Sequence, residues 1–226
     1  TPPVPPTESD HSAHVGLTLN AGNSESLRLN VGVVSAAALD EATTYQFGAD
    51  YNYGESSADD RPSRRDVDNG KLSAFVRTML RAPWFAAVDT SALFDHMADI
   101  EHRVTVGPAL GVELVRRAGL RWSVELGPAV LWERVAGVND QYLAVRVSEQ
   151  FEWRPDDRLR VWHRVEWTAE GSDPANALFN AELGIESRVG QRTWLRSVLQ
   201  DRYDARPAPG LRHTDVSLVT GLAVEL

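Results

Sequence analysis

The chain has 226 residues, 42% of them hydrophobic, and a formal net charge of -9. This acidic balance argues against nucleic acid as a partner, because proteins that bind phosphate chains usually carry a basic excess. The absence of cysteine excludes thiol catalysis, zinc-thiolate sites and disulfides. A helical membrane protein is excluded as well, since no stretch approaches the roughly 18 consecutive apolar residues that a membrane helix needs.

Residues 1–13 are predicted to form an extended periplasmic tail, because four of the first six residues are proline and no periodic pattern is present. We expect a mature chain whose signal peptide has been removed. From residue 14 to 226 the pattern predicts a single domain built of alternating runs, each the length of a strand. The apolar phases of these runs cover residues 15–19, 27–33, 45–53, 72–80, 84–94, 104–112, 120–132, 143–153, 159–167, 179–185, 195–199 and 216–226.

Residues 119–137 show the alternation most clearly. Leu120, Trp122 and later members of one phase are apolar, while Arg121, Glu125 and most of the other phase are polar. A period of two places the phases on opposite faces of a strand. The open question is whether the apolar face points into a core or into lipid.

The number of runs favours lipid. About twelve strands with their apolar phase inward would enclose a space that small residues such as Ala86, Ala92 and Ala181 could not fill. With the apolar phase outward, the charged phase faces a polar lumen, where water or opposite charges satisfy it. We therefore predict an all-β fold, a transmembrane antiparallel up-and-down β-barrel of about 12 strands.

Tryptophan placement supports this choice. Six of the seven tryptophans lie near run ends, which is typical of the aromatic girdles at both membrane boundaries. The predicted girdle consists of Trp84, Trp122, Trp132, Trp153, Trp167 and Trp194.

The connections give a further expectation. Apart from the first, they alternate long and short, with the long ones at the odd-numbered connections. Outer-membrane barrels have short periplasmic turns and longer external loops. The pattern therefore predicts long external loops, including one over residues 55–69.

Fourteen charged residues share the predicted interior phase. They are Arg28, Asp50, Arg77, Asp89, Glu113, Arg121, Glu125, Arg146, Glu152, Arg160, Arg164, Glu166, Glu182 and Glu186. One interpretation is a network of cross-lumen ion pairs that braces the barrel. The other is a narrow hydrophilic path for ions or small solutes, because about twelve strands lie between the packed interior of eight and the open channel of sixteen.

Three stretches resemble a known family: NAGNSESLRLNVG (20–32), VTVGPALGVEL followed by WSVELGPAVLWE (104–114 and 122–133), and the ending PGLRHTDVSLVTGLAVEL, which contains Asp215. They are similar to the YdiY-like group of salt-induced outer-membrane proteins. The resemblance implies a β-barrel of the Gram-negative outer membrane with a link to salt or osmotic stress, and it brings no catalytic residues. The final strand, with Gly221, Val224 and Leu226, also looks like a recognition signal for the barrel-assembly machinery.

Candidate chemistry is sparse. His163 and Ser197 share the lipid-facing phase, as in outer-membrane phospholipases, but two strands separate them. His96 and His102 lie in one loop with three acids, at a spacing that matches no established ligand pattern, so a solvated loop is the alternative to a metal site. We expect no enzyme activity, no metal and no cofactor.

Partners are predicted from the surface. Arg61, Arg64 and Arg65 lie in a mixed-charge segment that is either a solvated surface or a contact for anionic lipopolysaccharide. The expected function is passive: a narrow polar channel or an envelope-structural component of the outer membrane. The alternatives are a barrel that anchors a docked envelope protein through its tail or loops, and a lipid-modifying enzyme that uses His163.

Overall fold

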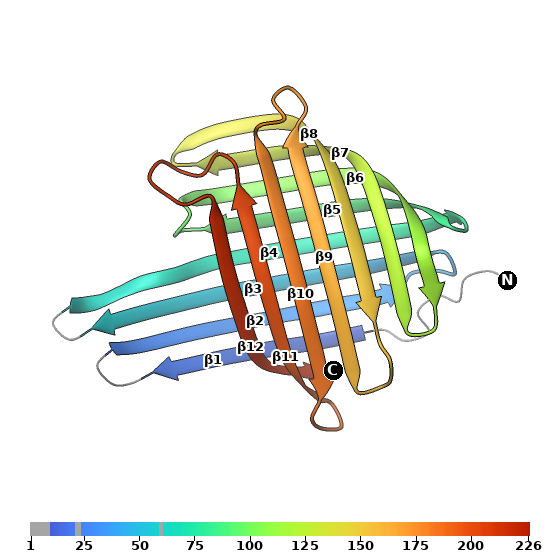
Figure 1. Cartoon of the computed structure of the whole chain (residues 1–226), viewed down its shortest axis with the longest axis horizontal. Coiled ribbons are helices and arrows are strands. Elements are labelled where there is room, and N and C mark those ends of the chain that lie inside the picture. Colours follow the sequence, from blue (N-terminus) through green and yellow to red (C-terminus); the bar gives the residue numbers. More distant parts are fainter. Residues whose placement is uncertain (1–9, 21–23, 59–60) are drawn as a thin grey trace.

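The computed structural model describes residues 10–20, 24–58 and 61–226. These residues form a single closed sheet in which every strand is antiparallel to its neighbours and β12 pairs with β1 (Figure 1). The strands are β1 (Asp10–Asn20), β2 (Ser24–Ala38), β3 (Thr43–Ala58), β4 (Arg61–Arg81), β5 (Trp84–Asp95), β6 (Ile100–Arg117), β7 (Leu120–Val135), β8 (Val138–Trp153), β9 (Leu159–Glu170), β10 (Ala177–Arg188), β11 (Thr193–Asp204) and β12 (Thr214–Glu225). The prediction of a closed antiparallel barrel of about twelve strands is confirmed.

In β7 and β8 the two phases differ in exposure. On the outward phase Leu126 is 56% exposed and Leu143 is 68% exposed, whereas inward-facing Leu131 is 0% exposed. The sheet thus presents apolar side chains to its surroundings and encloses its other face, as a lipid-facing barrel does. No helix long and apolar enough to cross a membrane occurs among the described residues.

The chain ends define the two ends of the barrel. Because neighbouring strands are antiparallel and the last strand pairs with the first, β1 begins and β12 finishes at the same end, which we call the termini end. The opposite, far end carries the odd-numbered connections, including residues 96–99, 171–176 and 205–213. Residues 1–9 of the predicted tail lie outside the described residues, and β1 begins at Asp10, before the predicted boundary at residue 14.

The connections correct one expectation. Residues 55–69 were predicted to form a long loop, but β3 continues to Ala58 and β4 begins at Arg61. Glu55 pairs with Arg65, and the Ser63 hydroxyl donates to the Glu55 carboxylate over 3.2 Å. In the sequence of this hairpin most positions of both parities are polar, so an apolar pattern does not detect it. As Figure 1 shows, the β1–β4 hairpins project well beyond the rest of the barrel.

Short turns follow from local chemistry. Ala136 and Gly137 connect β7 to β8 with φ of 49° and 76°, as in the two-residue hairpin turns whose central residues both have positive φ. In the β2–β3 turn the backbone amides of Ala42 and Thr43 each donate to Asp40 over 2.8 Å. These amide donors hold the pKa of Asp40 below its ordinary value, because they stabilise the carboxylate.

Closure depends on small residues at the seam. Val15 pairs with Leu222 where β1 meets β12, and Gly16 and Gly221 lie beside this pair. A Cβ on Gly221 would come within 2.6 Å of the Val15 carbonyl oxygen, closer than real Cβ atoms approach. The two backbones therefore meet at a distance that only glycine allows at this position.

Candidate functional site in the barrel interior

The strand register places all fourteen predicted lumen residues on the inward phase. In β7, for example, Arg121 and Glu125 share the phase of the buried Ala129 and Leu131, and β8 aligns Arg121 with Glu152. Their local surroundings differ. Some lie in a buried ion-pair network, whereas Arg121 and Arg164 are exposed to the space inside the barrel.

Arg146 on β8 is the centre of one ion-pair cluster, and only 2% of its own surface is exposed. Its Nη2 donates to Asp89 on β5 over 2.5 Å and to Glu125 on β7 over 2.8 Å, and its Nη1 donates to Glu166 on β9 over 2.9 Å. The Ser148 hydroxyl donates to the same Glu125 oxygen. One guanidinium therefore ties four strands together, and three carboxylates depend on its charge.

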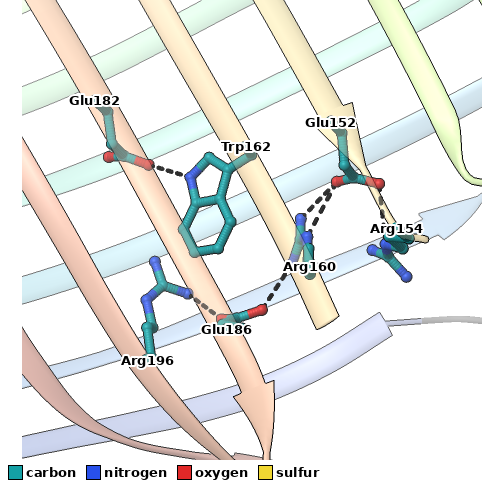
Figure 2. A network of polar contacts seen from close by, with 7 residues as sticks. All are labelled: Glu152, Arg154, Arg160, Trp162, Glu182, Glu186 and Arg196. Atoms are coloured by element: carbon teal, nitrogen blue, oxygen red, sulfur yellow. Dashed lines mark hydrogen bonds and ion pairs between the residues drawn. The ribbon is translucent and has the colours of Figure 1, made fainter. Parts of the chain in front are cut away.

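A second cluster lies nearer the termini end (Figure 2). Arg160 donates to Glu152 over 2.8 Å and pairs with Glu186 at 3.4 Å, and Glu186 in turn accepts from Arg196 over 3.0 Å. Arg154, directly after the end of β8, pairs with the other oxygen of Glu152 at 3.0 Å. The chain of alternating charges crosses from β8 to β11 along the inner wall.

Trp162 lies within this second cluster and points inward. The guanidinium carbons of Arg160 and Arg196 each lie 5.0 Å from the centroid of its ring, and its indole nitrogen donates to Glu182 over 2.7 Å. Gly184 faces it on β10, where a Cβ would overlap the indole. A bulky aromatic on one strand thus fills the space that glycine leaves on the next.

At the far end, ion pairs cross the lumen. Arg103 on β6 donates to Glu133 on β7 over 2.5 Å and to Asp204 on β11 over 2.8 Å. Arg202 on β11 pairs with Asp95 on β5 at 3.6 Å. In the ring of twelve strands β6 and β11 are five steps apart, and β5 and β11 are six, which is the opposite side. These two bridges therefore narrow the far end of the barrel.

The wall formed by the inward faces of β1–β4 has a different composition. Asn30 donates to Asn52 over 2.6 Å, and Asn52 donates to Asn69 over 2.9 Å, so that three strands are joined by side-chain amides. His14 pairs with Asp50 at 3.1 Å. We call this face the amide wall, and the inward face of β7–β11, with its arginines and carboxylates, the ion-pair wall.

The remaining predicted lumen residues form local pairs. Arg77 donates to Glu113 over 2.8 Å, with its guanidinium 3.5 Å from the centroid of the Phe85 ring. Arg28 pairs with Asp66 at 3.3 Å on the projecting hairpins, and its side chain is 60% exposed.

Sequence reasoning did not select Lys71, Arg103, Arg196 or Arg202, although each lies on an inward phase. Parity alone identifies them, since each alternates with an apolar or aromatic outward neighbour in the sequence.

The tryptophans require one correction. Trp84, Trp122 and Trp153 lie on the outward phase near the termini end, and Trp132 and Trp167 lie on that phase towards the far end. Trp194 was predicted to join the girdle, but it faces inward. Its neighbour Leu195 pairs with the outward Leu222, and the Arg188 guanidinium lies 5.4 Å from the centroid of the Trp194 ring.

The outward phase also carries a polar cluster near the termini end. His163 lies 3.3 Å from Glu149 and stacks on Phe151 with a centroid distance of 5.0 Å. Trp122 donates to the other oxygen of Glu149 over 2.6 Å. The Ser197 hydroxyl instead hydrogen-bonds that of Thr220 at 3.1 Å, so the structure does not bring His163 and Ser197 together.

The structure does not bring the candidate ligands of the histidine loop together. His96 pairs with Asp68 at 2.9 Å, and in the described ranges no three potential ligands converge on one point. Contact of Arg61, Arg64 and Arg65 with lipopolysaccharide stays a prediction.

Comparison with solved structures shows the fold of outer-membrane barrels. An outer membrane channel from Pseudomonas putida F1 is 11% identical with a TM-score of 0.54, over 99% of this chain and 96% of that chain. The NanC porin is 10% identical with a TM-score of 0.52, over 95% of this chain and 100% of its own. The translocator domain of the autotransporter NalP from Neisseria meningitidis is 13% identical with a TM-score of 0.52, over 96% of this chain and 87% of that chain.

At the sequence level, comparison with curated proteins found no match. The resemblance to the YdiY-like group is consistent with what the family comparison shows. Residues 13–226 match the family described as "Protein of unknown function, DUF481", and the chain belongs to that family.

Proposed function

We propose that the protein is a narrow polar channel of the bacterial outer membrane, with its constriction at the far end. The observation that carries this proposal is a contrast along the lumen. The bridges Arg103–Asp204 and Arg202–Asp95 cross the far end, whereas the inward side chains of Lys71, Arg121 and Arg164 remain exposed inside the barrel. In a packed interior such side chains would be covered, so their exposure supports a lumen that holds water.

The fold supports the same proposal in a weaker way. Two of the solved structures with this fold are described as an outer membrane channel and a porin. A third is the translocator domain of an autotransporter. The fold is compatible with passage of solutes, and the polar inner phase supplies the surface that small hydrophilic solutes need.

Unitary conductance in planar lipid bilayers tests the proposal. The purified barrel is expected to give small, ohmic current steps in KCl. The double variant Arg103→Ala/Arg202→Ala removes both far-end bridges and is expected to give larger steps, because the constriction widens. Arg117→Ala at the exposed end of β6 is the matched control and is expected to leave the step size unchanged. Absence of current from both the wild type and the double variant would overturn the proposed channel.

The Arg146 cluster favours a second candidate, a structural component of the envelope. Its guanidinium joins β5, β7, β8 and β9 through three carboxylates. This set of ion pairs between strands is larger than the wall of a channel requires. Such a barrel would stay closed to ions after the far-end bridges are removed. The bilayer measurement therefore separates the two candidates.

The link to salt or osmotic stress belongs to the proposal as well. A narrow outer-membrane path for small solutes would matter most when external osmolarity changes. Deletion of the gene is expected to slow recovery of growth after a shift to high salt, and equal recovery of both strains would remove this part of the proposal.

A further inference from the structure

An acidic side chain lies on the lipid-facing phase of β8. Glu149 stands between Val147 and Phe151, which share that phase, and its register partners on the neighbouring strands are Val124 and Val165. Its side chain is 26% exposed, so it can be reached from outside the barrel. An ionisable group in the membrane region is costly unless a partner meets it, and such a group therefore marks a candidate site.

The contacts of Glu149 fix its orientation. The Trp122 indole donates to one carboxylate oxygen over 2.6 Å, and His163 Nδ1 lies 3.3 Å from the other. Among the described residues these are its polar contacts, and neither partner carries a permanent positive charge. Inward acids such as Glu152 and Glu186 instead contact arginine. Glu149 is thus held in place without a permanent cation from its own chain.

An apolar hollow of about 270 Å³ lies beside this polar cluster on the same outer face. It spans β9–β12, four strands that lie side by side (Figure 1). Leu183, which lines the hollow, is the register partner of His163. The outward side chains that line it are Val161, Leu183, Ile185, Ser197, Leu199 and Leu218.

The hollow has a local cause in the sequence. Ser197 is the small residue between Leu195 and Leu199 on the outward phase of β11, and its hydroxyl hydrogen-bonds that of Thr220 at 3.1 Å. The row of large side chains is therefore interrupted at this position. Pockets that enclose a whole small ligand measure about 300–1,000 Å³, so this hollow suits a segment of a flexible apolar chain.

The acid and the hollow together match a phospholipid with an ammonium headgroup. The ammonium supplies the positive charge and the hydrogen-bond donors that Glu149 lacks. An acyl chain of the same molecule gains contacts in the hollow with side chains such as Leu183 and Leu199. The depth agrees as well, because Trp122 belongs to the aromatic girdle, and girdle aromatics lie at the level of the headgroups.

We propose that Glu149 and the adjacent hollow form a binding site for one phospholipid with an ethanolamine headgroup. The headgroup ammonium contacts the Glu149 carboxylate, and one acyl chain fills the hollow. Trp122 and His163 act as positioning residues that hold the carboxylate. The site lies on the outer surface of the barrel, so it is independent of the proposed channel.

Native mass spectrometry of the full chain in detergent micelles tests the site, with palmitoyl-oleoyl phosphatidylethanolamine and the matching phosphatidylglycerol as probes. Wild type is expected to retain one phosphatidylethanolamine about tenfold more tightly than phosphatidylglycerol, because only the first makes a charge-assisted hydrogen bond to Glu149. Glu149→Gln is expected to abolish this preference. Glu101→Gln, which alters an exposed acid paired with Arg134 at the far end, is the matched control and should behave as wild type does.

A second variant tests the hollow. Ser197→Leu fills it with an apolar side chain and is expected to weaken the binding of phosphatidylethanolamine without a change of charge. Heat-modifiable migration in gels establishes that each variant is folded before it is measured. Absence of bound lipid on wild type, equal binding of the two probes, or binding like that of wild type by either variant overturns the site.

The same spectra test a second copy of the chain as the occupant of this face. A dimer that persists without lipid and is lost in Ser197→Leu overturns the lipid site. Conductance separates the site from the proposed function, since Glu149→Gln should leave the unitary current unchanged. A conducting barrel that retains no phosphatidylethanolamine overturns the lipid site and leaves the channel standing. A barrel that retains it but carries no current keeps the site and rejects the channel.

Discussion

The amide wall and the ion-pair wall enclose the same lumen, yet they are held together by different interactions. On the amide wall, neutral side chains such as Asn30 and Asn52 join neighbouring strands through single hydrogen bonds. On the ion-pair wall, Arg146 and Arg160 each contact carboxylates on more than one strand. Figure 1 shows the strands of the amide wall passing behind β9–β12 at a steep angle.

The difference between the walls indicates which wall is rigid and which wall fills less of the lumen. Buried arginine–carboxylate clusters are costly to desolvate and rigid once formed, so they fix the geometry of the ion-pair wall. Amides and glycines take up less of the lumen and carry no charge. Exposed cations lie on both walls, Lys71 on the amide wall and Arg121 and Arg164 on the ion-pair wall, so the open space lies between the walls. The comparison can therefore be tested one wall at a time.

The largest effect is expected from Arg146→Met. This change leaves the buried Glu125 without its cation and also removes the partner of the half-buried Asp89 and Glu166, and breaking a buried pair of this kind costs about 3–5 kcal/mol. Urea unfolding in lipid vesicles measures the loss. Arg28→Met, whose side chain is 60% exposed on the projecting hairpins, is the matched control and should cost about 1 kcal/mol or less. Equal losses for the two variants would contradict the proposed division between the walls.

The outward face should respond differently from either wall. Leu126→Arg places a charge in the apolar belt and is expected to destabilise the barrel by about 2–4 kcal/mol, whereas Val138→Arg, at the far-end turn, should cost about 1 kcal/mol or less. Folding yield and urea midpoints in vesicles report both. Tolerance of arginine at position 126 would mean that this face does not contact lipid.

On the amide wall a smaller effect is expected. Asn52→Ala removes the link between Asn30 and Asn69, and each lost hydrogen bond between neutral groups is worth about 1 kcal/mol. The same unfolding assay measures this change. A loss as large as that of Arg146→Met would show that the amide wall also contains a tightly coupled network.

The smallest effect is expected at the β2–β3 turn. The lowered pKa of Asp40 means that its carboxylate stabilises the fold fully above the ordinary aspartate pKa, and that this stabilisation is lost as the pH falls through the lowered pKa. Asp40→Ala should therefore be slightly less stable than wild type at neutral pH and should match it in strong acid. A difference that grows as the pH falls would reverse the sign of this account.

Much of this architecture follows from alternation in the sequence. The parity of residues such as Arg121 and Leu126 predicts which side chains face inward, because the side-chain period of a strand is two. The pairing of Arg103 with Asp204 could not be predicted, since 101 residues separate them and their meeting depends on how the sheet closes. Trp194 was misplaced because the girdle was predicted from nearness to the ends of the runs and not from phase, whereas its parity is opposite to that of the outward Leu195.

The hydropathy pattern also does not predict where the strands end. Most positions of both parities are polar in the sequence of residues 55–69, so nothing in their hydropathy distinguishes a paired hairpin from a loop. The contact between His163 and Glu149 was not predicted either. Glu149 is polar on an apolar phase, and its contact with His163 becomes visible only when the register of β8 and β9 is known.

Cysteine accessibility tests the central claim most directly, because the chain contains no cysteine of its own. Lys71→Cys and Leu72→Cys differ by one position, and the account places the first in a watery lumen and the second against lipid. In intact vesicles, a charged, membrane-impermeant methanethiosulfonate reagent is expected to modify Lys71→Cys quickly and to leave Leu72→Cys unmodified. Modification of Leu72→Cys with protection of Lys71→Cys would contradict the account.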